Sequence, residues 1–345
     1  MTDSRTEIGT IGEFGLIERI KTLTTVTNKN TLLGIGDDAA EILSSKENML
    51  VSADMLVEGT HFDLTYMPLP HLGYKAISIN VSDIAAMYGT PEQVLVSIGL
   101  SNRFSVEAIE ALYEGINAAC KDFSIDLIGG DTVSSPSGLI ISVTVLGRTF
   151  NGTSVRRNGA KPNDILCVTG DLGGSFIGLQ VLEREKQEFS ANPDMQPQLE
   201  KYQYPVQRQL RPVARMDVVN KLRELKIVPT AMIDISDGLA SEALHLAKAS
   251  GVGVRLMEEN FPIDNLVFET AMEFKIDPTT CALHGGEDYE LLFTIKQDDF
   301  KKIEKHPDIH FIGYIQPENE GNILISKQKN VLPLEVRGWA HFDNT

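Results

Sequence analysis

The chain has 345 residues, 42% of them hydrophobic, which is typical of a globular protein with one large domain or two smaller ones. Its 48 acidic and 31 basic residues give a formal net charge of −17. Because an acidic surface repels nucleic acids and anionic membranes, we expect neither as a partner. A phosphate-bearing ligand would then be bound through metal ions, backbone amides or a few local cations.

The cysteines and the N-terminal sequence predict a cellular location. Cys120, Cys167 and Cys281 lie far apart and form no C-x-x-C pair, which is typical of buried thiols in a reducing compartment. The sequence MTDSRTEIGTIGEF lacks the apolar core of a signal peptide, and no segment reaches the ~18 apolar residues of a membrane span. We therefore expect a soluble, cytoplasmic protein.

The first part of the chain predicts alternating strands and helices. Hydrophobic periodicity predicts strands at 49–57, 93–100, 125–133 and 138–149, and helices at 74–89 and 105–123. Ser105 is the expected N-cap of the second helix, and Glu107 follows it closely. These segments form a set rich in βαβ units, and we expect a first domain over residues 1–150.

A polar linker with Gly and Pro at 151–164 opens the second domain, which we expect over residues 151–345. A strand, a Gly-rich turn and a helix are predicted at 164–183, and a strand followed by a helix at 231–250. Short strands are expected at 289–295, 310–315 and 322–326. The charged, Pro-containing segment 183–212 is predicted to be an exposed insertion with about one helical turn.

A short pattern recurs in the two halves. INVSDIA at 79–85 and IDISDGL at 233–239 share an apolar, polar, apolar, Ser, Asp order. Such an echo fits two halves that are built on similar α/β units.

Carboxylates recur at the expected strand ends and helix starts, beside glycine or other small residues. They are Asp37 and Asp38 in GIGDDAA, Asp54, Asp83, Asp131, Asp234, Asp237, Glu287 and Asp288. Any single one is most simply an N-cap or a turn residue. Gathered in one place the set would repel itself, and Mg²⁺, which binds through a few carboxylates and substrate phosphates, would stabilise it. The joint pattern therefore predicts a magnesium-dependent site.

Other catalytic classes have no sequence support. The chain contains no G-x-x-x-x-G-K-[ST], no G-x-G-x-x-G after a strand, and no H-E-x-x-H, and its seven histidines lack zinc-ligand spacing. GLASEAL is not the G-x-S-x-G of a nucleophile elbow.

Seven ordered motifs resemble those of the thiamine-monophosphate kinase family, within the superfamily of aminoimidazole ribonucleotide synthetase. They are GIGDDAA, SADMLVEGTHF, KAISINVSDIAAMYGTP, LIGGDT, RRNGAKPND, MIDISDGL and HGGEDYELLFT. The resemblance implies a mixed α/β (α+β) fold of two domains, an N-terminal dimerising domain with an acidic ATP site and a C-terminal α/β domain that covers the site. It also implies a homodimer that phosphorylates thiamine monophosphate to thiamine diphosphate, with ATP as co-substrate and several Mg²⁺ ions.

The resemblance also implies roles for single residues. The metal ligands would be Asp38, Ser52, Ala53 by its carbonyl, Asp54, Asp83, Asp131, Asp234 and Asp237. Contacts to ATP would come from Tyr113, Gly130, Asp131, Arg157 and Ser236, and contacts to the thiamine phosphate from His61, Glu287 and Trp339. Asp37 would orient a water or cap the turn.

Several of these residues have a second interpretation. Tyr113 lies on an amphipathic helix and is as well suited to the core as to an adenine contact. His61 could be a satisfied strand histidine, and Trp339 could be an aromatic residue that covers a surface. Tyr88, where relatives carry a run of small residues, is expected near the site or on the dimer surface.

The expected chemistry needs no general base, and no catalytic base is assigned. The acceptor is a phosphate monoester whose second pKa is ~6, so it is mostly an anionic nucleophile at neutral pH. Catalysis would then consist of positioning and charge neutralisation by metal ions, with Arg157 as a direct cationic contact.

Two alternatives to this function remain open. The first is another ATP-using member of the superfamily, although the early reactive Cys and Lys of a selenophosphate synthetase and the C-terminal Cys of a hydrogenase-maturation protein are absent. The second is a non-catalytic sensor of nucleotides or metal ions that has kept the fold.

Overall fold

The computed structural model describes residues 6, 8–33, 35, 41–43, 47–194 and 196–335. The chain divides into two compact units, the first comprising Met1–Ile84 with Gly89–Thr153 and the second Ala85–Tyr88 with Ser154–Thr345. This division differs from the predicted limits, 1–150 and 151–345, mainly in assigning residues 85–88 to the second unit. Among the described residues, no helix combines the length and the apolar content that crossing a bilayer requires.

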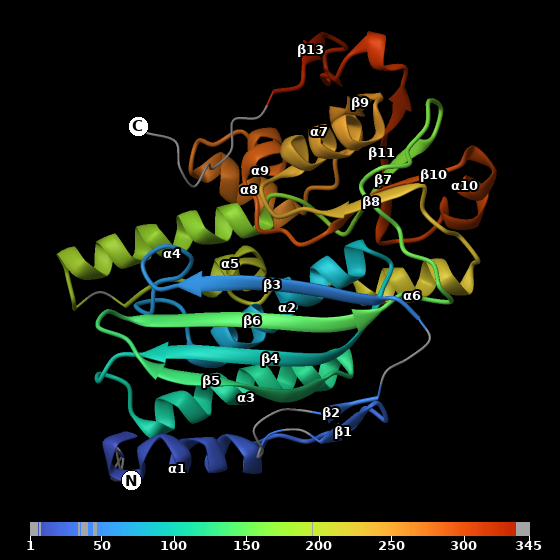
Figure 1. The fold of residues 1–345 in the computed structure, drawn as a ribbon. Coiled ribbons are helices and arrows are strands. Elements are labelled where there is room, and N and C mark those ends of the chain that lie inside the picture. The colour runs from blue at the N-terminus through green and yellow to red at the C-terminus, as the bar shows by residue number, and fades with distance from the viewer. Residues whose placement is uncertain are drawn as a thin grey trace. The chain divides into compact units, whose positions relative to one another are not determined.

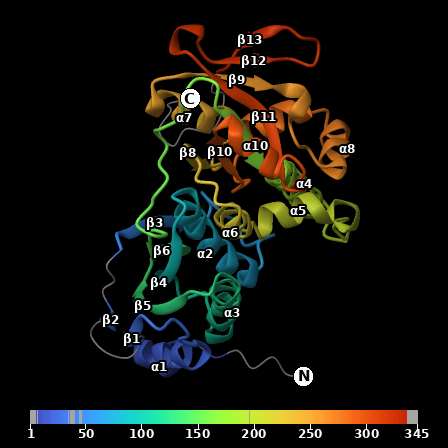
Figure 2. The ribbon, with the colours of Figure 1, turned by 90° about the vertical axis from the view of Figure 1, so that its right-hand side faces the viewer.

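The first unit is built on a four-stranded sheet with the order β3-β6-β4-β5. Its strands are β3 (Met49–Val57), β4 (Thr90–Leu100), β5 (Asp126–Ser134) and β6 (Leu139–Arg148). β4 and β5 are parallel, and the other neighbouring pairs are antiparallel. The helices α2 (Leu69–Ala86) and α3 (Val106–Phe123) lie on the same face of the sheet (Figure 1, Figure 2).

Helix α3 shows why the sequence prediction succeeds in this unit. The side chain of Ser105, the predicted N-cap, accepts a hydrogen bond from the backbone N–H of Ala108, and Ser124 ends the helix in the left-handed conformation. Gly115 lets α3 approach α2 closely, since a Cβ atom there would lie 1.8 Å from the carbonyl oxygen of Pro70. Capping and one small residue thus fix both the ends and the packing of the helix.

Smaller elements complete the first unit. Helix α1 (Ile8–Leu23) contacts α3, and β1 (Thr31–Leu33) pairs with β2 (Glu41–Ile42) in a two-stranded antiparallel sheet.

The second unit contains a seven-stranded sheet with the order β13-β12-β9-β11-β7-β10-β8. Its strands are β7 (Ile165–Thr169), β8 (Ala231–Asp234), β9 (Gly253–Met257), β10 (Leu291–Ile295), β11 (Ile309–Gln316), β12 (Ile323–Ile325) and β13 (Val331–Pro333). All neighbouring pairs are antiparallel except β12 with β9. Every residue of β10 is buried, so this strand is covered on both faces.

The helices of the second unit follow the strands in sequence. They are α4 (Gly174–Ala191), α5 (Gln203–Leu210), α6 (Met216–Glu224), α7 (Leu239–Ser250), α8 (Asn265–Glu273), α9 (Pro278–His284) and α10 (Gln297–Ile303), with 3₁₀ turns at η1 (Glu200–Tyr202), η2 (Glu258–Asn260) and η3 (Glu318–Glu320). Apolar residues of α7 and α9 join residues of six of the strands in one buried cluster. The predicted strands, and the strand followed by a helix at 231–250, are confirmed.

Three expectations need correction, two of them in part. Segment 183–212 is exposed only in part, mainly at residues 187–194 and 196–198: α4 continues to Ala191, and α5 buries Pro205, Val206, Gln209 and Leu210. The many charged residues of this segment hid an apolar stripe at helical spacing.

The internal echo does not mark two equivalent structures. Asp83 lies inside helix α2, whereas Asp237 lies in the turn between β8 and α7. For Tyr88, only the surface alternative is excluded, because the residue is 2% exposed, and its expected place near the site stays a prediction. Its hydroxyl donates to the carbonyl oxygen of Ile227 at 3.1 Å, and the Arg223 guanidinium stands 5.1 Å from its ring centroid.

Candidate active site

The first group of polar side chains lies where β3 faces α2. Ser52 and Asp54 alternate along β3, and alternate residues of a strand point to the same face. The hydroxyl of Ser52 donates to the carboxylate of Asp83, and the backbone N–H of Asp54 donates to Oδ1 of the buried Asn80 at 3.1 Å. The structure therefore brings three predicted metal ligands, Ser52, Asp54 and Asp83, into one group.

Electrostatics distinguish this group from an ordinary strand surface. The pKa of Asp54 is raised to about 6, first by burial and then by the negative charge of Asp83. Such a carboxyl is stabilised when a cation neutralises it. The donor set of a hydroxyl and two carboxylates has the hard oxygen chemistry that Mg²⁺ prefers.

Strand pairing separates Asp131 from Asp54. Asp54 pairs with Val143, Val143 with Val96, and Val96 with Gly130, so these four residues share a face of the sheet. Asp131, the next residue, therefore lies on the opposite face, beside Ser97.

Gly130 and Ala53 have mainly backbone roles. Gly130 allows the close pairing of β5 with β4, since a Cβ atom there would lie 1.7 Å from the carbonyl oxygen of Val96. Ala53 is exposed and precedes Asp54 on β3, so its side chain lies on the face opposite that carboxylate.

Tyr113 and His61, two predicted substrate contacts, both have structural roles within the first unit. Tyr113 is 3% exposed on the buried side of α3, and burial raises the pKa of its phenol, which favours the core role over the adenine contact. His61 follows β3 in a turn, where its Nδ1 accepts from the backbone N–H of Val57 at 3.1 Å. That bond leaves the Nε2 side of the ring to carry the proton in the neutral form.

The second group of polar residues belongs to the IDISDGL motif of the second unit. Asp234 is the last residue of β8 and is buried, whereas Ser236 and Asp237 are exposed in the turn before α7. Gly238 is required in this turn: its φ is +118°, and a Cβ atom would lie 2.6 Å from the carbonyl oxygen of Leu283.

Glu242 is an acidic residue that the sequence analysis missed. It is 2% exposed in the first turn of α7, and its Oε1 accepts from the backbone N–H of Asp237 at 3.2 Å. Its Oε2 has no hydrogen-bond partner among the described residues. Burial, followed by the charges of Asp237 and Asp234, raises the pKa of Glu242 to about 8. A carboxylate on the apolar face of a predicted helix is the signal that could have identified it.

The HGGEDYE motif is hydrogen-bonded to the same turn. The backbone N–H of Glu287 donates to the carbonyl oxygen of Ser236 at 2.6 Å, and that of Tyr289 donates to Ile235 at 2.8 Å. Glu287 has a φ of +56° and Tyr289 one of +52°. The structure thus brings Ser236 and Glu287 together on a backbone fixed by both motifs.

Asp288 and Glu290, which follow Glu287 in the same motif, contact residues of the unit's interior. Asp288 accepts from the backbone N–H of Gly173 at 2.9 Å, at the start of α4. Because a carboxyl oxygen of Asp288 already accepts from this N–H, the N–H is not available to a phosphate. Burial raises the pKa of Asp288 to about 7, against the opposing effect of Arg208. Glu290 forms ion pairs with Arg208 at 3.0 Å and Arg215 at 2.7 Å.

Arg157 lies in the loop that precedes β7, and its side chain is exposed. Its carbonyl oxygen accepts from the Ser250 hydroxyl at 3.2 Å, and the same hydroxyl accepts from the N–H of Gly159 at 3.1 Å. The loop is therefore attached to the C-terminal end of α7. Asp37, Asp38 and Trp339 lie outside the described residues.

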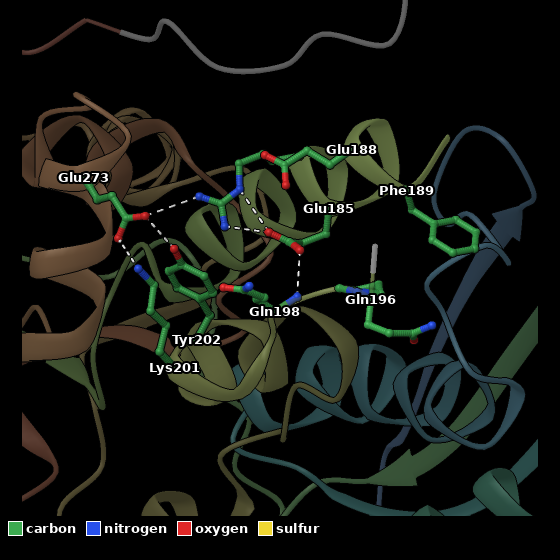
Figure 3. Close-up of a pocket in the computed structure, with 10 residues that line it drawn as sticks. Glu185, Glu188, Phe189, Gln196, Gln198, Lys201, Tyr202 and Glu273 are labelled. Carbon is green, nitrogen blue, oxygen red and sulfur yellow. Dashed lines mark hydrogen bonds and ion pairs between the residues drawn. The ribbon is translucent and has the colours of Figure 1, made fainter. Parts of the chain in front are cut away.

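A cavity of about 310 Å³ is lined by the segment that was predicted to be an insertion (Figure 3). Its charged groups satisfy one another: Arg184 pairs with Glu185 at 2.7 Å and with Glu273 at 3.3 Å, and Lys201 pairs with Glu273 at 2.9 Å. None of the predicted site residues lines it. We assign this network to the packing of α4 against α8.

Within the described parts of the chain, no three His, Cys, Asp or Glu side chains are gathered so as to hold a metal ion by themselves. Mg²⁺ usually takes one or two carboxylates and completes its shell with waters and substrate phosphates.

Comparisons with known proteins match the chain along most of its length. Residues 36–149 match the family described as AIR synthase related protein, N-terminal domain, and residues 161–328 match AIR synthase related protein, C-terminal domain. Thiamine-monophosphate kinase of Bacillus subtilis (strain 168) is 36% identical over 339 residues, which cover 96% of this chain and 99% of the relative.

Solved structures agree with the sequence comparison. The crystal structure of thiamine-monophosphate kinase from Stenotrophomonas maltophilia K279a has a TM-score of 0.78 at 33% identity and covers 91% of this chain and 96% of that one. AaThiL complexed with AMPPCP and TMP has a TM-score of 0.75 at 34% identity and covers 99% of this chain and 100% of that one. These likenesses confirm the predicted fold class.

Proposed function

The chain belongs to the thiamine-monophosphate kinase family and is an ATP-dependent kinase, and we propose that Mg²⁺ bound by its carboxylates assists direct transfer of phosphate from ATP to thiamine monophosphate. The product would be thiamine diphosphate. The binding of both AMPPCP and TMP by the similar AaThiL supports these two substrates.

The observation that carries the proposal is a difference between buried carboxyl groups: one is paired with arginines, and others lie near further carboxylates. The structural carboxylate Glu290 has two arginines within 3.0 Å. In contrast, the pKa of Asp54 is raised first by burial and then by the charge of Asp83, and that of Glu242 first by burial and then by the charges of Asp237 and Asp234, so negative charges lie near both. Divalent cations would relieve this repulsion when they enter with the phosphates of the substrates.

The proposed ligands follow from the donor chemistry of each group. Ser52, Asp54 and Asp83 would bind Mg²⁺ in the first unit, and Asp234 and Asp237 in the second. Asp38, Asp131 and the carbonyl of Ala53 complete the proposed set. When bound, the ions would neutralise phosphate charge and orient the two reacting groups.

The proposed substrate contacts use the remaining predicted residues. Gly130, Asp131, Arg157 and Ser236 would contact ATP, whereas Tyr113 is retained only as a residue behind that site, since it is buried. His61, Glu287 and Trp339 would contact thiamine monophosphate. The chain's own residues would bind and orient the substrates, and the acceptor phosphate, already deprotonated at neutral pH, would attack without a general base.

A homodimer through the first unit is also proposed. The face of its sheet away from α2 and α3 exposes Met49, Val51 and Met55 from alternate positions of β3, together with Val133 of β5. Each of these side chains is more than half exposed, and together they form an apolar face typical of an interface. A second copy of the chain, with the same apolar face, is the proposed partner. Sedimentation of Val51→Asp, which should dissociate the dimer, tests this.

A cytoplasmic location is proposed as well. Cys120, Cys167 and Cys281 are free and buried, and burial raises the pKa of each thiol to about 12. Unreactive thiols are compatible with a reducing compartment.

Product analysis tests the proposed reaction. The purified protein should convert thiamine monophosphate and ATP into thiamine diphosphate and ADP, should require Mg²⁺, and should not phosphorylate free thiamine. The hydroxyl of thiamine has a far higher pKa than a phosphate and would need a base. Saturable binding of ATP and Mg²⁺ without any turnover would instead favour the sensor alternative.

A further inference from the structure

We infer that Gln209 is a positioning residue that holds the Glu287 carboxylate in place for the acceptor substrate and thereby sets the KM for thiamine monophosphate. The inference rests on the proposed function, in which Glu287 contacts that substrate. Gln209 belongs to α5, in the segment whose role the sequence did not indicate.

Contacts on both ends of the side chain support this role. Gln209 is 3% exposed, and its Nε2 donates to Oε2 of Glu287 at 2.9 Å. Its Oε1 accepts from the hydroxyl of Ser175, which is fully buried near the start of α4. A carboxylate can only accept here and the hydroxyl supplies the other proton, so the two neighbours fix the orientation of the amide.

The backbone of Glu287 is fixed independently. Its N–H donates to Ser236 at 2.6 Å, its φ is +56°, and Gly286 before it has a φ of +72°. The backbone therefore determines where the Glu287 side chain begins, and Gln209 determines where its carboxylate ends. A carboxylate has about four acceptor sites, so the hydrogen bond from Gln209 is compatible with a further donor on the substrate.

Helix α5 is itself anchored, which makes it a suitable support. Arg208, the preceding residue, pairs with Glu290 at 3.0 Å, and the Tyr204 hydroxyl donates to Asp171. Gly178 of α4 allows close contact, since a Cβ atom there would lie 2.0 Å from the carbonyl oxygen of Pro205. The hydrogen bond to Glu287 thus comes from a rigid element.

A role limited to packing would give a different result from a positioning role. If Gln209 only stabilised α5, its loss would lower the melting temperature or change all kinetic constants together. If it positions Glu287, its loss changes the KM for thiamine monophosphate and leaves kcat and the KM for ATP nearly unchanged.

The test compares Gln209→Glu, Glu287→Gln and the double variant Q209E/E287Q in steady-state kinetics and in calorimetric titration with thiamine monophosphate. Q209E places two carboxylates side by side and should raise the KM for thiamine monophosphate about tenfold, which corresponds to about 1.4 kcal/mol. In the double variant the new carboxylate accepts from Ser175 and from the amide introduced at position 287, whose carbonyl can still accept from the substrate. Its KM should return to that of E287Q alone.

Two further variants complete the design. Gln207→Glu places the same charge on an exposed position of α5 and should leave all constants unchanged. Gln209→Met, similar in length but without the hydrogen bonds, replaces Q209E if that variant does not fold, and it should also raise the KM for thiamine monophosphate.

The possible failures are distinguishable. If E287Q raises this KM but Q209E and Q209M do not, the positioning role is wrong and the proposed role of Glu287 stands. If E287Q leaves the KM and the calorimetric affinity unchanged, the proposed substrate contact itself is wrong. An equal rise in both KM values, with no recovery in the double variant, would assign Gln209 to packing alone.

Discussion

The hydroxyl of Ser52 donates a hydrogen bond to the carboxylate of Asp83, and this bond connects strand β3 to helix α2. The bond leaves Asp83 close enough to Asp54 to raise the pKa of that carboxyl. One structural contact therefore assembles an oxygen-rich group at the cost of electrostatic repulsion. Repulsion that is retained in a fold is typical of a functional site.

Replacing Asp54 should separate stability from function. Asp54→Asn removes the charge that repels Asp83, so we expect an unchanged or higher melting temperature in metal-free protein and the loss of most turnover. Thermal unfolding in EDTA and a coupled ADP assay measure the two effects. Asp298→Asn, at an exposed position in the first turn of α10, is the matched control and should retain activity. A markedly lower melting temperature for D54N would identify Asp54 as a structural residue.

Asp288 should make the stability of the protein decrease as the pH rises. Its pKa is raised from 3.8 to about 7, so the folded state holds a proton that the unfolded state has lost. The stabilisation is complete below about pH 4 and disappears as the pH passes through 7. The groups that act on it are Arg208, Asp171 and Glu290.

Thermal unfolding of Asp288→Asn and wild type between pH 5.5 and 8.5 tests this expectation. The variant does not titrate at this position. The melting temperature of the variant minus that of wild type should therefore increase as the pH rises from 5.5 to 8.5, whatever its value at pH 5.5. Asp298→Asn should show a constant offset. A constant difference for D288N would mean that Asp288 is ionised throughout.

Glu290 should behave as a structural carboxylate. It is 1% exposed, and it pairs with both Arg208 and Arg215. Glu290→Gln would remove the carboxylate that Arg208 and Arg215 share, although Arg215 would keep its pair with Asp217 at 3.0 Å. Breaking a buried pair costs about 3–5 kcal/mol of unfolding free energy. Urea denaturation measures it. Glu259→Gln breaks an exposed pair with Lys329 and should have little effect. Equal small losses for both variants would contradict the assignment.

The sequence predicted the elements of the fold well, because their signals are local. The alternation of MLVSADMLV along β3 and the N-cap at Ser105 need no information from the rest of the chain. Helix α5 was missed because its apolar stripe is short and lies among charged residues. Its burial comes from contact with α4, which a pattern over a few residues does not reveal.

The candidate site was only partly predictable for the same reason. Periodicity places Ser52 and Asp54 on one face of β3, but their contact with Asp83 depends on how α2 crosses the sheet. Tyr113 shows a second limit of sequence-based prediction. A core residue and a ligand contact on an amphipathic helix have the same sequence pattern, so the pattern does not distinguish the two roles. Gln209 matters through Glu287, a partner far away in sequence, and no motif marks it. Glu242 has its partner Asp237 nearby, but its burial depends on how α7 packs.

Trp339, the only tryptophan of the chain, should report binding of the acceptor. It lies outside the described residues, so this prediction depends on the sequence alone. Thiamine carries a thiazolium cation and a flat aminopyrimidine ring, and a cation–π contact with an indole is worth ~0.5–2 kcal/mol. Thiamine monophosphate should therefore change the intrinsic tryptophan fluorescence in a saturable way, and ATP should do so only weakly.

Trp339→Ala should raise the KM for thiamine monophosphate roughly tenfold, the factor that ~1.4 kcal/mol implies, with the KM for ATP nearly unchanged. Trp339→Phe keeps an aromatic face and should restore most of the affinity, because the ring quadrupole rather than the indole N–H attracts the cation. If Trp339→Ala kept its normal acceptor KM, or lost affinity for ATP instead, Trp339 would be a packing residue and its assignment to the acceptor would be wrong.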